Sequence, residues 1–86
     1  MDELKSLRQQ IDAVDIHILQ LLGKRIAIMK AIGKIKKEYG NGIRDPQREQ
    51  EKIKTLEEKA KELEIPPSLI SILWQAIFHL SDEIEK

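Results

Sequence analysis

The chain contains no cysteine, and its 86 residues include only one tryptophan, one tyrosine and one phenylalanine. Without cysteine it can form no disulfide, thiol nucleophile or cysteine-bound metal site, and its two histidines, His17 and His79, lie far apart in the sequence. The 15 basic residues balance the 15 acidic residues, so no overall field attracts nucleic acid or an anionic membrane. The composition therefore points away from thiol chemistry and from nucleic-acid binding.

Long hydrophobic runs are also missing. No apolar stretch approaches the roughly 20 residues that span a bilayer, and the first residues, MDELKSL, lack the apolar segment of a signal peptide. We therefore expect a soluble, cytoplasmic protein that makes no membrane contact. Its length predicts a single domain over residues 1–86, and a monomer of this size would be only marginally stable.

What the sequence does contain is a long amphipathic pattern in its first half. Apolar residues recur at alternating spacings of three and four, which predicts one face of a long helix from about Asp2 to Glu38. Arg25 interrupts this pattern, and a buried guanidinium must be paired. We call the apolar members of this pattern the apolar seam: Leu4, Leu7, Ile11, Val14, Ile18, Leu21, Ile28, Ile32 and Ile35.

Two shorter helices follow the long one. Asp45 can cap a helix whose first position is Pro46, and we expect this second helix to end at Pro66 and Pro67. A third helix begins at Pro67 or Ser68 and is apolar nearly all round, so it should be the most buried segment. The predicted fold class is all-α, with one long and two short helices.

The unequal helix lengths predict a homodimer. The long helix overhangs either partner helix by about half its length, and the apolar seam continues along the overhang. We therefore expect two long helices to cross antiparallel about a two-fold axis, which brings Arg8 of one chain between Arg25 and Lys36 of the other. Within one chain Arg8 and Arg25 lie about 25 Å apart, too far to hold one small ligand.

Charged residues near the apolar stripes predict a ligand pocket. Arg25 and Lys36 share nearly the same helix face at an axial separation of about 16 Å. Guanidinium groups bind carboxylates and carboxylates accept from hydroxyls, so the expected ligand is a polyanionic metabolite with a hydroxyl. The alternative is a buried salt bridge between Arg25 and Glu49 that only fixes helix packing. The expected lining comprises Arg25, Lys36, Arg48, the partner's Arg8, Glu49 and Glu85.

Four segments carry a resemblance to a known family. They are Leu7-Arg8-Gln9-Gln10-Ile11-Asp12, Leu21 to Arg25, Gly33-Lys34-Ile35-Lys36 and Arg44-Asp45-Pro46-Gln47-Arg48-Glu49, the last with the form R-D-x-x-R-E. With these segments the chain resembles the all-helical class of chorismate mutases over nearly its whole length. The resemblance implies an intertwined three-helix homodimer that rearranges chorismate to prephenate in phenylalanine and tyrosine biosynthesis. Some small members of this family dock onto another shikimate-pathway enzyme.

The resemblance also implies roles for the basic residues. By position, Arg8 comes from the partner chain and joins Arg25 and Arg48 in holding the two substrate carboxylates. Lys36 donates a hydrogen bond to the ether oxygen whose bond to carbon breaks. Such a pericyclic reaction needs no nucleophile, base or metal, so we expect no cofactor. Its rate depends on holding the compact substrate conformer and on donors aimed at the developing negative charge.

Acidic and hydroxyl residues complete the implied site. Asp45 and Glu49 match positions that receive the ring hydroxyl, and Ser81 matches a carboxylate contact. Glu85 stands where other members carry Gln or Glu and where, together with Lys36, the side chain contacts the ether oxygen. Because an ionised carboxylate cannot donate a hydrogen bond, Glu85 must be protonated to serve in this role.

Two other functions explain part of the pattern. A non-catalytic dimerisation or adaptor module accounts for the apolar stripes and the charged outer faces, but it leaves Arg25, Glu49 and the Ser81/Glu85 pair unrelated. A nucleic-acid-binding domain would rest on the lysines near the end of the long helix, which zero net charge and the scarcity of aromatic residues argue against.

Overall fold

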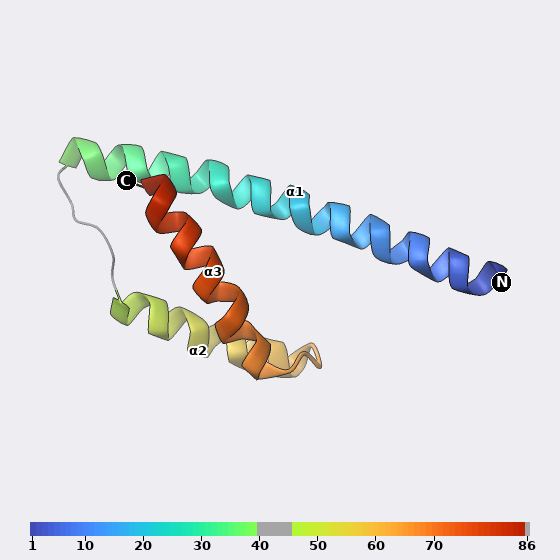
Figure 1. Cartoon of the computed structure of the whole chain (residues 1–86). Helices are drawn as coiled ribbons and strands as arrows, with labels where there is room; N and C mark the ends of the chain where they lie inside the picture. Colours follow the sequence, from blue (N-terminus) through green and yellow to red (C-terminus); the bar gives the residue numbers. More distant parts are fainter. Residues whose placement is uncertain (40–45, 86) are drawn as a thin grey trace.

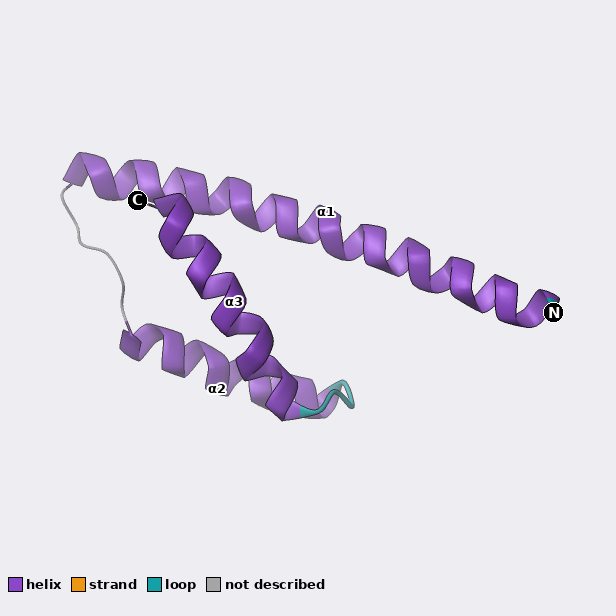
Figure 2. Cartoon of the chain, viewed as in Figure 1, coloured by secondary structure: helices purple, strands orange, loops and turns teal. Residues whose placement is uncertain are grey.

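The computed structural model describes residues 1–39 and 46–85, apart from the side chains at positions 39 and 85. The described residues form three helices and no strand: α1 spans Asp2–Tyr39, α2 spans Pro46–Glu62 and α3 spans Pro67–Glu85 (Figures 1 and 2). The all-α prediction of one long and two shorter helices is confirmed for these residues. The expected turn at 40–42 and the capping residue Asp45 lie outside the described residues.

Helix α1 sets the length of the molecule. Acidic Asp2 and Glu3 stand in its first turn and Lys36 and Lys37 in its last, which is the arrangement that the helix dipole favours. Its 38 residues extend about 57 Å, matching the 58 Å long axis of the chain. The radius of gyration is 16.5 Å, whereas a compact domain of this size has about 12 Å. The N-terminal half of α1 therefore projects beyond the other two helices (Figure 1).

Helix α2 ends at Glu62, four positions before Pro66, so the two prolines that were expected to end the helix follow its end and do not form it. Glu64 adopts a left-handed conformation with φ of 60°. The Ile65 amide then donates to the Ala60 carbonyl at 2.8 Å, and the Glu64 amide donates to the Lys61 carbonyl at 3.2 Å. This pair of hydrogen bonds is the Schellman motif, in which glycine is usual at the left-handed position. The chain here terminates a helix without the residue that normally signals the end.

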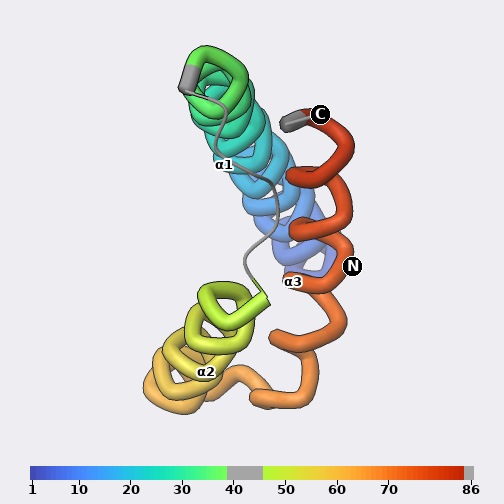
Figure 3. The backbone as a smooth tube through the Cα atoms, turned by 90° about the vertical axis from the view of Figure 1, so that its left-hand side faces the viewer, coloured from blue at the N-terminus to red at the C-terminus, as the bar shows by residue number. Residues whose placement is uncertain are grey.

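Helix α3 runs along one side of the other two helices, from α2 to the C-terminal part of α1, and contacts both (Figure 3). Helices α1 and α2 do not approach each other within 8 Å between Cα atoms anywhere in the described part of the chain. The buried apolar residues are Met29 on α1, Ala60 on α2, and Ile70 and Phe78 on α3. Helix α3 has the smallest share of exposed residues of the three helices, so the expectation that it is the most buried segment is confirmed for the described residues, although some of its apolar side chains, such as Ile72, are exposed.

The apolar seam of α1 is exposed in the single chain. The exposed fraction of its residues runs from 39% at Leu4 to 60% at Ile11. A neighbouring stripe packs toward α3 instead: Ile26 is half-buried, and Met29 and Gly33 are buried. One chain therefore covers one side of α1 and leaves the seam open along the whole helix. No helix among the described residues combines the length and apolar content that a membrane crossing requires.

The two glycines inside α1 occupy different environments. Gly23 is exposed, and a Cβ placed on it would meet nothing within 4 Å. Gly33 is buried, one turn after Met29 on the stripe that faces α3. Gly33 therefore lies on the covered side of α1, whereas Gly23 faces solvent.

Candidate active site

Arg25 extends from α1 toward α3. Its Nη1 atom donates to the Ser81 hydroxyl oxygen at 3.0 Å and to the Met29 sulfur at 2.9 Å, and the side chain is half-buried. Ser81 belongs to the last turns of α3, so the contact joins residues that lie 56 positions apart in the sequence. The guanidinium that interrupts the apolar seam therefore has polar partners where α1 and α3 meet.

The Ser81 hydroxyl is oriented by its own helix. Its oxygen lies 3.1 Å from the carbonyl oxygen of Ile77, one turn earlier in α3, and also contacts the Met29 sulfur. A hydroxyl carries one proton and two lone pairs, so it can donate toward Ile77 while it accepts from Arg25. Ser81 thereby presents an acceptor to the cation on α1.

Aromatic side chains continue the Ser81 face of α3 toward its N-terminus. Phe78 is buried, and Trp74 follows one turn further away. The Trp74 indole Nε1 is buried and has no hydrogen-bond partner among the described residues. Leaving such a donor unsatisfied costs about 1–3 kcal/mol. The part of α3 that leads from Ser81 toward the N-terminus of the helix is therefore apolar on this face.

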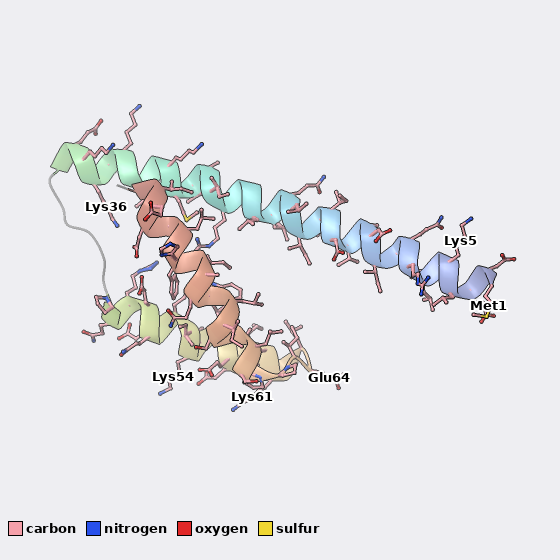
Figure 4. The ribbon with its side chains drawn as sticks, viewed as in Figure 1. Met1, Lys5, Lys36, Lys54, Lys61 and Glu64 are labelled. Atoms are coloured by element: carbon pink, nitrogen blue, oxygen red, sulfur yellow. The ribbon has the colours of Figure 1, made fainter. Side chains whose placement is uncertain are left out.

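Lys36 extends the cationic site toward the C-terminal end of α1. Figure 4 shows its side chain pointing to the side of α1 on which α2 and α3 lie. Lys36 and Glu49 are half-buried and Arg48 is exposed, and each of the three has a polar or electrostatic partner. Glu49 and Arg48 stand in the first turn of α2. The structure therefore puts two cations, Arg25 and Lys36, on the side of α1 toward the other helices. Arg48 and Glu49 belong to α2, no described Cα atom of which lies within 8 Å of one in α1.

The single chain does not bring Arg8 to this region. Arg8 is exposed on the projecting half of α1, about 25 Å along the helix from Arg25. Asp45 lies outside the described residues, and so does the side chain of Glu85, although α3 ends at Glu85 on the same end as Ser81. No group of three or more His, Cys, Asp or Glu in the described ranges is suited to hold a metal ion.

Met29 is the residue that the sequence reasoning missed. It lies beside the apolar seam and not within it, so the seam pattern gave it no role. Its position four residues after Arg25 was the available signal, because residues at that spacing are neighbours on a helix. The contacts with Met29 and Ser81 both use Nη1, so these two residues do not occupy the Nε and Nη2 edge of the guanidinium. That edge has the geometry of a fork for a carboxylate.

Comparison with protein families matches residues 7–86 to the family described as chorismate mutase type II. No solved structure matches the chain. The chorismate mutase of Methanocaldococcus jannaschii is 26% identical over 86 residues, which is 100% of this chain and 87% of that protein.

Two longer relatives are more similar in sequence over shorter stretches. The T-protein of Enterobacter agglomerans is 41% identical over 68 residues, covering 79% of this chain and 18% of the T-protein. The bifunctional chorismate mutase/prephenate dehydratase of Aquifex aeolicus is 47% identical over 51 residues, covering 59% of this chain and 14% of the relative. The matched stretches thus cover less than a fifth of the length of either protein.

Proposed function

Because the chain belongs to the chorismate mutase type II family, we propose that it rearranges chorismate to prephenate in phenylalanine and tyrosine biosynthesis. The observation that carries this proposal is the contact between Arg25 and Ser81. Both positions match carboxylate-binding positions of the family, and they converge although they lie 56 positions apart in the sequence. A cation beside an apolar face is costly if it serves only helix packing, whereas it is expected in a site that binds an anionic substrate.

The proposed reaction occurs within one substrate molecule. The ether carbon–oxygen bond breaks while a new carbon–carbon bond forms, and no proton or electron leaves the substrate. Arg25 and Arg48, with the partner's Arg8, hold the two carboxylates and so select the compact conformer. Lys36 donates a hydrogen bond to the ether oxygen as negative charge develops on it.

The acidic residues act on the rest of the substrate. Asp45 and Glu49 accept hydrogen bonds from the ring hydroxyl, which orients the ring. Glu85, in its protonated form, donates to the ether oxygen beside Lys36. The site therefore combines donors at the breaking bond with acceptors at the hydroxyl, and all of the chemistry is positioning and electrostatics.

The proposed active form is a homodimer in which each copy, residues 1–86, is one helical domain. The exposed apolar seam and the projecting half of α1 support a second copy that packs along α1 in the antiparallel direction. The copies bury the seam against each other, which is a large favourable term for so small a chain. The partner's Arg8 then reaches the region between Arg25 and Lys36.

The homodimer also docks onto a second enzyme in this proposal. The Aquifex aeolicus relative is named as both a chorismate mutase and a prephenate dehydratase, and the matched stretch is a minor part of it. By analogy, this chain docks onto another enzyme of the same pathway. The mutase reaction itself needs only the homodimer, so it does not depend on this association.

The direct test is turnover of chorismate by the purified chain. We expect chorismate to disappear and prephenate to accumulate in equal amount, with no added metal or cofactor. A correctly folded dimer without turnover anywhere between about pH 5 and 8 would instead favour the adaptor function, for which the exposed seam alone is sufficient.

A further inference from the structure

Met29 lies at the contact between Arg25 and Ser81, and it has no role in the reaction as proposed above. Its side chain is only 4% exposed, and its sulfur lies 2.9 Å from Arg25 Nη1 and also contacts the Ser81 hydroxyl. We propose that Met29 is a positioning residue whose sulfur, together with Ser81, fixes the Arg25 guanidinium before substrate binds. The catalytic part of this inference rests on the proposed function, since Arg25 there holds a substrate carboxylate.

The donors of Arg25 support this role. Nη1 carries two N–H groups, and two acceptors stand within hydrogen-bond distance of it, the Ser81 oxygen at 3.0 Å and the Met29 sulfur at 2.9 Å. A half-buried guanidinium gains from each acceptor because unsatisfied donors are costly away from water. Two acceptors on one nitrogen fix both the direction and the rotation of the planar group. Both acceptors are themselves held, Ser81 by the Ile77 carbonyl and Met29 by burial.

A thioether suits this position better than a charged acceptor. Sulfur in methionine is a weak, polarisable and uncharged acceptor. It orients the guanidinium without neutralising it, so the full positive charge remains for the substrate. A carboxylate at position 29 would orient Arg25 more strongly, but it would also repel a substrate that carries two carboxylates.

The consequence is a preset fork for the ligand. Because the contacts with Met29 and Ser81 use Nη1, the fork of Nε and Nη2 faces away from them and is presented to a carboxylate. Because the fork is already ordered before substrate binds, substrate binding has a smaller entropic cost. Replacing the Met29 sulfur should therefore lower kcat/KM, because Arg25 is no longer held in position, while the fold stays intact.

The kinetic test uses substitutions of similar size. Met29→Leu keeps the volume but removes the acceptor, and we expect kcat/KM for chorismate to fall roughly 10-fold, within what small misplacements cost. Met29→Gln supplies a carbonyl acceptor at a similar distance and should restore most of the loss. Ile26→Leu, on the same α3-facing stripe one turn earlier, is the matched packing control and should leave kcat/KM unchanged.

A second readout needs no turnover. In the substrate-free protein, ¹⁵N relaxation of the Arg25 Nε group, assigned by its loss in Arg25→Lys, should show a rigid side chain that Met29→Leu releases to an order parameter below about 0.6. Met29→Gln should keep the side chain rigid. If wild-type protein fails to convert chorismate, the proposed function is wrong, but this measurement still decides the role of Met29. An Arg25 side chain equally rigid in wild type and Met29→Leu, or an equal loss of kcat/KM in Met29→Leu and Met29→Gln, would overturn the proposal.

Discussion

At the scale of single residues, the chain has a charged side chain, Arg25, at a position where the helical pattern calls for an apolar one. Arg25 interrupts the apolar seam, and its polar partners come from α3 and from the next turn of α1. Such a cation is costly to bury unless its donors are satisfied, and here Ser81 and Met29 accept from it. A group held in this way is prepared for an anion, which is the basis of the catalytic proposal.

Lys36 provides the sharpest residue-level prediction. Lys36→Ala should lower kcat about 10²- to 10³-fold, because one preorganised donor to the developing charge is lost. The measurement is steady-state conversion of chorismate, with thermal unfolding to check the fold. Lys37→Ala is the matched control, since Lys37 is the exposed neighbour in the same helical turn, and it should retain near wild-type kcat. Equal rates in the two variants would exclude Lys36 as a donor.

Glu85 adds a prediction about pH. Only its protonated form donates to the ether oxygen, so wild-type activity should rise as the pH falls and Glu85 gains its proton. Glutamine donates at every pH, so Glu85→Gln should flatten the pH–rate profile and raise activity most at neutral pH. The check is kcat measured across the pH range for both proteins. The proposed role fails if the two profiles have the same shape.

The sequence predicted some of these residues and missed others for physical reasons. Arg25 was recognisable because it breaks a strict apolar period, and Ser81 because it extends an apolar stripe with a polar group. Met29 gave no such signal, since an apolar residue beside an apolar stripe is ordinary. Its role depends on the rotation of α1 against α3, which a repeat of three and four does not specify.

At the scale of elements, helix starts were predictable and one helix end was not. Pro46 and Pro67 fix the starts of α2 and α3, because proline fits the first turn. The end of α2 depends instead on Glu64 in a left-handed conformation, which a glutamate does not reveal. The face of α1 that contacts α3 was not predicted, because the seam is the stronger pattern whereas α3 packs on the stripe beside it.

The α2 end gives a stability prediction with a matched control. Glu64→Gly should raise the free energy of unfolding by about 0.5–1 kcal/mol, because glycine adopts the left-handed conformation without the steric cost of a Cβ. The larger conformational entropy of glycine in the unfolded state offsets part of this gain. The same substitution in the interior of α2, Glu58→Gly, should lower it by about 1 kcal/mol. Urea unfolding measures both. A destabilised Glu64→Gly variant would argue against the Schellman ending.

At the scale of the whole molecule, the single chain is elongated and leaves its apolar seam uncovered. A radius of gyration of 16.5 Å and exposed seam residues along all of α1 are unfavourable for an isolated chain of 86 residues. The proposed antiparallel dimer covers the seam and supplies the partner's Arg8 to the site of the other chain. One helix then serves two sites, with Arg25 and Lys36 in its own and Arg8 in its partner's.

The measurement that tests this arrangement most directly is complementation between Arg8→Ala and Arg25→Ala chains. Each variant alone should lose about 10²- to 10³-fold in kcat. After the two are mixed equally and refolded together, half of the dimers are mixed and each mixed dimer has one intact site, so about a quarter of wild-type activity should return. A refolded mixture no more active than its parents would contradict a site shared between two copies of α1.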